Sequence, residues 1–548
     1  MAEGARPLSA PVFDADRRGK IGLGLGAAAG LWLFLGVAFL ALLFGAAEGV
    51  SPSALFGDSY LRGVVLFTLE QAFLSALLSV VGAVPLALAL HRTAFPGRGL
   101  VLRLLLLPQA LPVLVGALGL LAVWGRSGIV SQGLVLLGLP RLDIYGLSGI
   151  LIAHVFFNLP LATRLLFASL DAVPGESWRL AGQLGFSGAS TFRLIEWPAM
   201  RRALPGAASL TFMICITSFT LVLVLGGGPG ATTLEVEIYQ SLRADFDPAR
   251  AVVLSLAQIV LTAVFLALTL RLAGRLDTAF TLGRPARRFG KPSLASRLLD
   301  GAVLLLGLSF ILLPFAAIVI NGAKADLARL FGDPLLHRAA LTSLAVSLGA
   351  ACLSSLLALS LLFGREALRD GGRGARLVGT FLDLSSGVVL VVPPVVVGAG
   401  WFLLLTGRVD VFAFAPAMVV ATNAVMAMPF TMRILGPALT ETLARHRRLA
   451  AHLGLQGLSR LRHIEWPALR GPLGLGFALA LALSLGDLGV VALFGNEDFV
   501  TLPFLLYQRM GSYRTADAAG IALILGAASL ILVTLAEAAF RKRGNDAR

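Results

Sequence analysis

The stretch RLAGQLGFSGASTFRLIEWPAMR, residues 179–201, has a second copy, RLAAHLGLQGLSRLRHIEWPALR, at residues 448–470. The copies align at a constant spacing of 269 residues and share the run Ile-Glu-Trp-Pro-Ala near their ends. Both are basic and of mixed polarity, whereas the sequence around them is strongly apolar. A match of this length indicates an internal repeat, so we expect two related halves built around the two copies.

The composition is that of a membrane protein. Of the 548 residues, 57% are hydrophobic and only 14% are charged, and the mean hydropathy is +0.86. A helix needs about 20 apolar residues to cross a bilayer core, and the recurrence of such runs predicts an all-α polytopic membrane protein with about twelve transmembrane helices. The expected spans are 21–46, 62–90, 104–124, 145–168, 203–226, 251–270, 298–321, 339–364, 377–406, 411–436, 472–494 and 517–540.

The distribution of Lys and Arg predicts the orientation of these spans. The formal net charge of +15 is dispersed through short loops, whereas a nucleic-acid surface would gather it on one face. With a cytoplasmic N-terminus, the inner loops and tails hold 32 Lys and Arg residues and the outer loops hold 11. Positive residues favour the cytoplasmic side, so both termini and both copies of the repeat are expected in the cytoplasm.

Six expected spans separate the copies, so the two halves run parallel and are related by a pseudo-two-fold axis along the membrane normal. We expect a first half at 1–275 with a loop at 171–202, a linker at 276–297, and a second half at 298–548 with a loop at 437–471. The repeat also continues beyond these loops. After a one-residue slip, Gly227, Thr233 and Tyr239 match Gly495, Thr501 and Tyr507.

The sequence contains no catalytic constellation. The nearest approach to a nucleotide-binding loop is Gly290-Lys291-Pro292, which lacks the glycine-rich phosphate cradle and the metal-binding hydroxyl. The six histidines do not have the spacing of metal ligands on a common face. We expect a protein that is not an enzyme, binds no metal or cofactor itself, and depends on another chain for any ATP hydrolysis.

Three carboxylates fall inside expected spans, where ionisable groups are costly and often functional: Glu70, Asp383 and Asp487. We consider Glu70 and Asp487 as candidates for lining a substrate pathway. For Asp487, a position near the membrane interface or a local pair is an equally good explanation. For Asp383 that structural explanation is the better one.

The repeated stretch predicts a short helix, a turn and a second short helix that ends at Trp-Pro. Apolar residues recur at helical spacing in both copies, and Gly185 and Gly454 permit the turn. One interpretation is a helix in the lipid headgroup layer, anchored by Trp197 and Trp466. The other is a docking element for a partner with two-fold symmetry, which explains why the same glycine and the same ending occur twice.

These residues resemble the cytoplasmic signature of the permeases of binding-protein-dependent ABC importers: Glu-Ala-Ala, three residues, Gly, and an Ile-x-x-Pro-type ending. The glycines and prolines keep their places, and Arg-Leu-Ala replaces Glu-Ala-Ala in both copies. The resemblance implies that the stretch couples the permease to its ATPase. The residues assigned to this role are Arg179, Leu180, Ala181, Gly185, Glu196, Pro198, Arg448, Leu449, Ala450, Gly454, Glu465 and Pro467.

Over nearly the whole chain the sequence is most similar to the fused permeases of thiamine and thiamine pyrophosphate importers. The likeness is carried by QAFLSALLSVV (71–81), YGLSGILIAHVFFNLPLATRLL (145–166), LGGGPGATTLEVEIYQSL (225–242) and GDLGVVALFGNEDFVTLPFLLYQRMGSYR (486–514). It implies a type I ABC importer permease of the bacterial inner membrane, working by alternating access. The implied partners are two copies of a cytoplasmic ATPase, which uses ATP and Mg, and a periplasmic binding protein.

The matched outer segments are predicted to border the substrate exit from the binding protein. Gly227, Thr233 and Tyr239 would form this gate with their three counterparts in the second half, although structural turns explain the glycines alone. A ferric iron importer is the alternative within the same class. A secondary transporter or channel would be active without an ATPase, and a membrane enzyme would need a catalytic cluster; the duplicated docking stretch favours neither.

Overall fold

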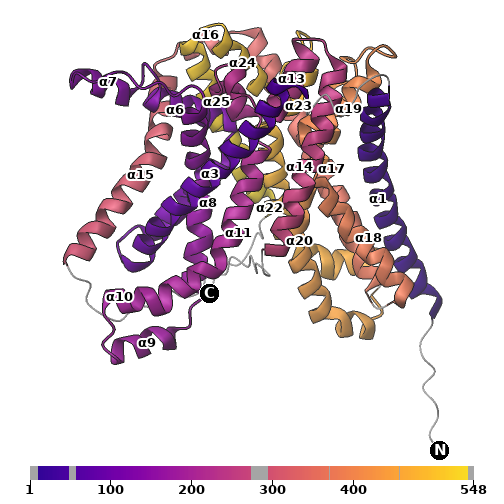
Figure 1. Cartoon of the computed structure of the whole chain (residues 1–548). Helices are drawn as coiled ribbons and strands as arrows, with labels where there is room; N and C mark the ends of the chain where they lie inside the picture. Colours follow the sequence, from indigo (N-terminus) through magenta and orange to yellow (C-terminus); the bar gives the residue numbers. More distant parts are fainter. Residues whose placement is uncertain (1–9, 48–56, 273–293, 370, 456, 541–548) are drawn as a thin grey trace, which may run out of the picture. The chain divides into compact units, whose positions relative to one another are not determined.

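The structure is a computed structural model that describes residues 10–47, 57–272, 294–369, 371–455 and 457–540 (Figure 1). Every regular element in these residues is helical, which confirms the all-α prediction. Ten of the described helical segments are long and apolar enough to cross a membrane. An eleventh would be the pair α18 (Arg373–Val389) and α19 (Pro394–Leu405), which is bent by 90°.

Several of the twelve expected spans are broken in the structure, including 377–406 at the bent pair and 472–494 between Leu485 and Gly489. In place of 104–124, three helices run in succession: α4 (Arg98–Leu104), α5 (Leu107–Ala110) and α6 (Val113–Trp124). Pro108 lies in the first turn of α5 and Pro112 precedes α6, because proline removes a backbone donor and clashes with the preceding helical turn. In place of 203–226, the chain forms α11 (Trp197–Ile216) and α12 (Thr220–Leu225). The segment Val113–Leu136, which contains α6, is one of the ten candidate spans, whereas 203–226 has no counterpart among them. The number twelve therefore stays a prediction.

Contacts divide the chain into two compact units, and unit 2 holds residues 50–330 and 506–524. Its centre is formed by α3 (Ser59–Arg92), α8 (Leu147–Asp171) and α11, which pack against one another through buried side chains such as Leu86, Leu166 and Met200. Figure 1 shows these three helices side by side, with α9 (Gly175–Gln183) and α10 (Gly188–Thr191) at one end and α13 (Leu234–Arg243) at the other. The further elements of unit 2 are α7 (Ile129–Leu136), η1 (Phe192–Glu196), η2 (Pro229–Ala231), α14 (Pro248–Leu272) and α15 (Leu294–Ala323).

Unit 1 holds residues 1–49, 331–505 and 525–548. Its core forms where α17 (Pro334–Leu368), α20 (Ala415–His452) and α22 (Trp466–Leu485) pack together. The other elements within it are α18, α19, α1 (Ala10–Ala47), α21 (Gly457–Arg460), η3 (Leu461–Glu465) and α23 (Gly489–Phe494). Residues of α16 (Leu327–Phe331), α24 (Leu502–Gly511) and α25 (Thr515–Phe540) are divided between the units.

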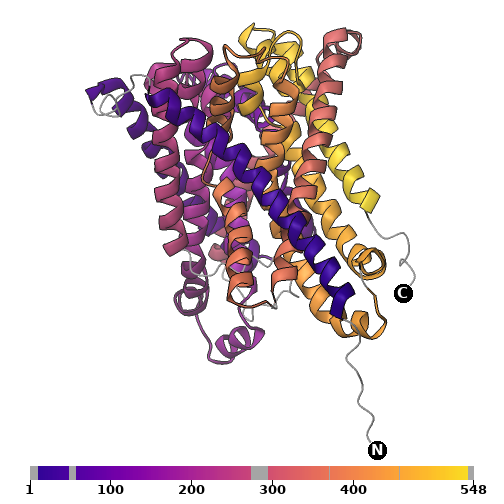
Figure 2. The ribbon, with the colours of Figure 1, turned by 90° about the vertical axis from the view of Figure 1, so that its right-hand side faces the viewer.

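Helix α1 lies across α17 and α19, as Figure 2 shows for the long indigo helix. At the crossing of α1 and α17, a Cβ atom on Gly24 would lie 2.8 Å from the Cα atom of Gly364. Only glycine fits on both sides of so close an approach, which is the small-residue contact that membrane helices use. The N-terminal helix is thereby held against the helices around the second copy of the repeat.

The contacts group the helices differently from the repeat in the sequence. Helix α1, which precedes the first copy, belongs to unit 1, and α15, which follows it, packs on α3 and α6 in unit 2. The expected linker at 276–297 lies outside the described residues as far as residue 293. The two sequence halves, with boundaries at 1–275 and 298–548, stay a prediction.

Candidate functional site

The first copy of the repeat forms a short helix that ends at a glycine turn. Helix α9 ends at Gln183, and Gly185 has a φ of 64°, in the left-handed region that costs other residues about 1–2 kcal/mol. The backbone N–H of Phe186 donates to the carbonyl of Ala181 at 3.0 Å, which closes the helix end as in a Schellman motif. The predicted turn at Gly185 is confirmed.

The second copy forms the same turn at the end of a much longer helix. Gly454 has a φ of 63°, and the N–H of Leu455 donates to the carbonyl of Ala450 at 2.9 Å. Here, however, the residues before the glycine belong to α20, which has 38 residues. In the first copy α8 ends at Asp171, and Pro174, with a ψ of 139°, separates it from α9.

Both turns leave the same apolar side chains exposed. Leu180 and Leu184 are 55% and 62% exposed, and their counterparts Leu449 and Leu453 are 51% and 62% exposed. The alanines between them face inward, since Ala181 and Ala450 are 6% and 4% exposed. Arg179 is exposed, whereas the side chain of Arg448 lies outside the described residues. Each copy therefore presents a leucine pair away from its own unit's core.

After the turn, both copies enter a π-helical turn at the same five positions. These are η1 and η3, which run without a break into α11 and α22. The N–H of Trp197 donates to the carbonyl of Phe192, five residues back, and Trp466 does the same to Leu461. The prediction of a short helix ending at Trp-Pro is therefore wrong. Pro198 and Pro467 lie in the first turn of the next helix, where a missing N–H is tolerated.

The glutamate of the Ile-Glu-Trp-Pro run is fully buried in the first copy. Glu196 is 0% exposed, and Arg92, in the last turn of α3, donates from Nε to its Oε1 at 3.0 Å and from Nη2 to its Oε2. Arg92 Nη1 also lies 3.9 Å from the Oδ1 atom of Asp300 in α15. The carboxylate thus joins η1 to α3 inside unit 2 instead of facing outward with the leucines.

Its counterpart in the second copy is buried in the same way with a different partner. Glu465 is 0% exposed, and Lys20 of α1 donates to its Oε1 at 3.0 Å. Arg460 Nε lies 3.2 Å from the same oxygen, and Asp16 lies 3.6 Å from the Lys20 ammonium. In unit 1 the carboxylate therefore joins η3 to α1.

Sequence reasoning missed the partners of these glutamates and one further anchor. Trp178 of α9 is 1% exposed, and its ring centroid lies 5.2 Å from that of His91 in the last turn of α3. The only available signal for Arg92 and Lys20 was a basic residue at one end of an apolar span, which predicts topology and no partner.

The predicted gate residues lie at the end of unit 2 that carries α13, and in unit 1 near α23. Thr233 and Thr501 are 1% and 3% exposed. Tyr239 packs edge-to-face on Phe219, with ring centroids 5.5 Å apart. Burial raises the pKa of Tyr507 to about 12, and the nearby Tyr239 phenol adds to the shift. Both of these repeat-related tyrosines belong to unit 2.

The glycines of the predicted gate have unlike roles. Gly227 is exposed and has a φ of 75°, a conformation that favours glycine. Gly495 is buried, and a Cβ atom there would lie 2.8 Å from the carbonyl oxygen of Val491. The backbone conformation at Gly227 and the lack of space at Gly495 therefore explain glycine at the two positions without a role in a gate.

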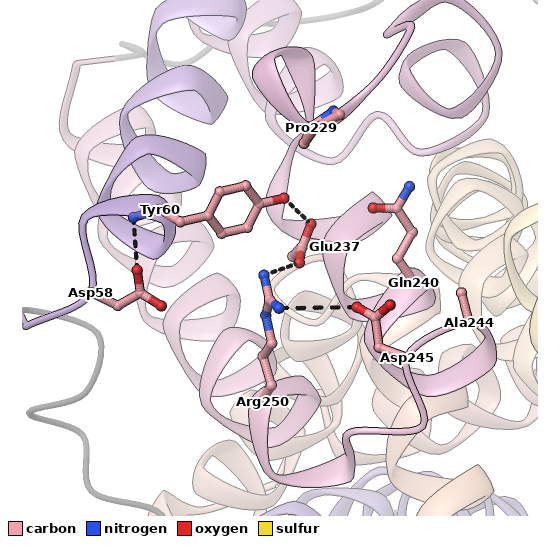
Figure 3. Close-up of a pocket in the computed structure, with 8 residues that line it drawn as sticks. All are labelled: Asp58, Tyr60, Pro229, Glu237, Gln240, Ala244, Asp245 and Arg250. Carbon is pink, nitrogen blue, oxygen red and sulfur yellow. Dashed lines mark hydrogen bonds and ion pairs between the residues drawn. The ribbon is translucent and has the colours of Figure 1, made fainter.

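A polar pocket of about 540 Å³ opens beside α13 (Figure 3). Glu237 lies at its centre, where it accepts a 2.8 Å hydrogen bond from the Tyr60 hydroxyl and pairs with Arg250. Arg250 also lies 4.0 Å from Asp245. The pocket is lined by Asp58, Tyr60, Pro229, Glu237, Gln240, Ala244, Asp245 and Arg250. Its carboxylates outnumber its single cation, so it favours positively charged groups.

The two candidate pathway carboxylates have different surroundings. Glu70 is exposed on α3. Asp487 lies two residues after the end of α22 and is half-buried; its Oδ1 accepts a 3.0 Å hydrogen bond from the N–H of Gly489, at the start of α23. Among the described residues, no group of three or more His, Cys, Asp or Glu is arranged to hold a metal ion.

Comparison with known proteins gives a family match and close relatives. Residues 357–542 match the family described as the inner membrane component of binding-protein-dependent transport systems. The chain is 52% identical over 511 residues to the thiamine transport system permease protein ThiP of Brucella abortus, covering 93% of each protein. It is 45% identical over 501 residues to ThiP of Salmonella typhimurium, covering 91% of this chain and 93% of that protein. ThiP of Escherichia coli K12 is 44% identical over the same length and with the same coverage.

Proposed function

The chain belongs to the ThiP family of binding-protein-dependent transport permeases, and on this premise we propose that it is the membrane subunit of an ATP-driven importer of thiamine or thiamine pyrophosphate. It would take its substrate from a periplasmic binding protein and release it into the cytoplasm by alternating access. The single observation that supports this best is the extent of the likeness, since relatives named for thiamine transport match nine-tenths of the chain.

The repeated stretch is proposed as the pair of docking sites for two copies of an ATPase. A partner that exists as a symmetric pair needs two similar surfaces. The chain supplies them as the exposed leucine pairs Leu180 and Leu184, and Leu449 and Leu453, each beside a left-handed glycine. Apolar side chains exposed next to a rigid turn are suited to binding a pocket on a partner. ATP and Mg would be bound by the ATPase.

The proposed function also implies a membrane and an orientation for the chain. Multiple apolar helices make the chain a multi-pass membrane protein. We place it in the inner membrane in two parallel six-helix halves, with both termini in the cytoplasm, because this places the leucine pairs on the side where ATP is available. The end of unit 2 that carries α13 then faces the binding protein, opposite the end that carries α9 (Figure 1).

The substrate pathway is proposed to begin near the matched segments at that outer end. Tyr239 and Tyr507 offer aromatic faces, which attract a cationic ring such as a thiazolium. Asp487 offers a carboxylate, one oxygen of which accepts a hydrogen bond from the N–H of Gly489. Glu70 is the less favoured pathway candidate, because its exposed position on α3 does not place it in a polar enclosure.

The test is uptake in a strain that carries only this system for thiamine. We expect uptake of labelled thiamine that requires this chain, the ATPase and the binding protein together. Uptake that continued without the ATPase would indicate a secondary transporter. Labelled ferric iron serves as the second substrate, and transport of iron without thiamine would overturn the proposed substrate.

A further inference from the structure

The two buried glutamates of the Ile-Glu-Trp-Pro runs occupy the same place in both copies. Glu196 and Glu465 each end a π-helical turn, and both are 0% exposed. A buried ion pair contributes little to stability compared with apolar packing, and its best-supported use is to fix a register or a switch. A π-turn often occurs at functional positions. The position of Glu196 and Glu465 therefore suggests a function in addition to stabilising the fold.

In unit 2 the glutamate joins the docking element to the end of one long helix. Two hydrogen bonds from the planar guanidinium of Arg92 hold Glu196, so the contact is rigid in direction as well as distance. The adjacent His91 contacts Trp178 of α9. The last turn of α3 is therefore held by both segments of the docking element, and Asp300 of α15 lies beside the same arginine.

In unit 1 the glutamate joins the docking element to α1. The ammonium of Lys20 is 3.0 Å from Glu465 Oε1 and lies over the ring of Phe363, 5.3 Å from its centroid. The Lys20 side chain is only 18% exposed, so water weakens the pair little. A lysine makes a single-point contact that rotates more freely than an arginine fork.

We propose that Glu196 and Glu465 are positioning residues that transmit the movement of the docked ATPase to α3 and α1. The inference rests on the proposed function, because it needs an ATPase on the docking elements. When η1 moves, separating Glu196 from Arg92 would break two charge-assisted hydrogen bonds in a buried place, so α3 moves with it. When η3 moves, Arg460 stays beside Glu465, and the cost of separation is the lost hydrogen bond to Lys20, which leaves a largely buried ammonium with fewer partners. The exposed leucines receive the movement, and the buried glutamate of the π-helical turn that follows them passes it on.

The test uses the complete complex with ATPase and binding protein, reconstituted in liposomes. We expect Glu196→Gln and Glu465→Gln each to lower the ratio of thiamine transported to ATP hydrolysed by about tenfold, within the range of coupling between sites. The matched control is Glu537→Gln, which makes the same exchange at an exposed position of α25 and should leave the ratio unchanged. An unchanged ratio in both glutamate variants would overturn the proposal, with or without a fall in thermal stability.

Two further measurements keep the result decisive. If a glutamine variant fails to assemble, Arg92→Lys and Lys20→Arg keep the charge while changing the geometry, and the ratio in these variants decides instead. Hydrogen exchange of the last turn of α3 and of α1, with and without ATP and vanadate, requires no substrate. The ATP-dependent change should disappear in the glutamine variants, and its persistence would count against the proposal. If wild-type complex shows that change without transporting thiamine, the substrate is wrong and the exchange measurement still tests the glutamates.

Discussion

The two copies of the repeat have the same turn and different connections to the membrane helices. In the first copy, Pro174 separates α8 from α9, and Trp178 fixes the separate short helix to α3. In the second copy, position 443 is leucine in place of that proline, and α20 continues to the glycine turn. A docking element can thus be held by side-chain packing or by an unbroken backbone, and one chain uses both solutions.

The largest loss of stability is expected on substitution of Trp178, which anchors the first copy only. Trp178→Ala removes a fully buried aromatic side chain that holds α9, and we expect the free energy of unfolding to fall by about 3–5 kcal/mol. Thermal unfolding in detergent, followed by circular dichroism, measures this. Trp197→Ala, at a position that is 39% exposed, is the control and should cost clearly less. Equal costs would mean that α9 is not held by Trp178.

Exchanging Leu443 and Pro174, the residues at which the two copies differ, tests whether the unbroken backbone of α20 holds the second copy. Leu443→Pro places proline inside α20 and should cost about 3 kcal/mol, because it removes a hydrogen bond and clashes with the preceding turn. Pro174→Leu in the first copy should cost less than about 1 kcal/mol, since that position is already outside a helix. The same unfolding experiment compares the two. A cost for Leu443→Pro as small as that for Pro174→Leu would show that continuity of α20 is unimportant.

The glycine turns should respond alike in both copies. Gly185→Ala and Gly454→Ala introduce a Cβ at φ values of 64° and 63°, and each should cost about 1–2 kcal/mol. No heavy atom lies within 4 Å of a Cβ at either site, so the cost is conformational and not steric. Chemical denaturation of each variant measures the loss in the free energy of unfolding. Losses that differ by more than about 1 kcal/mol would show that the two turns are not equivalent.

The exposed leucines should affect stability least. Leu180→Ser and Leu449→Ser change surface positions and should alter the free energy of unfolding by no more than about 0.5 kcal/mol. Loss of apolar contact area should nevertheless weaken ATPase binding, measured as the amount of ATPase that co-purifies with the permease. Both variants retaining full ATPase binding would remove these residues from the docking surface.

Much of the helical architecture could be predicted from the sequence because long apolar runs and glycine turns are local signals. The turn at Gly185 required only helical spacing before it and a glycine after it. The break near Pro108 and Pro112 was visible as prolines within an expected span, but its consequence, three helices in place of one, depended on where each helix restarts. Proline marks a probable boundary without fixing the path that follows.

The partners of the buried glutamates could not be predicted because they lie far away in the sequence. Glu196 and Arg92 are 104 residues apart, and Glu465 and Lys20 are 445 residues apart. No local pattern relates such positions, and a basic residue at a span end has an adequate explanation in topology alone. Nothing in the structure explains why arginine begins the repeated stretch in both copies.

The contact between α1 and α17 has a consequence for how the chain is made. The ribosome must complete more than 300 further residues after Gly24 before Gly364 exists to pack against it, and the partner of Lys20 appears later still. During that time α1 has to remain in the bilayer without its final neighbours. Its mean hydropathy of 2.4 makes this stay in the bilayer possible. Until Glu465 has been synthesised, the Lys20 side chain can extend to the lipid interface. Helix α1 is therefore expected to insert first and to join its final bundle late in biosynthesis.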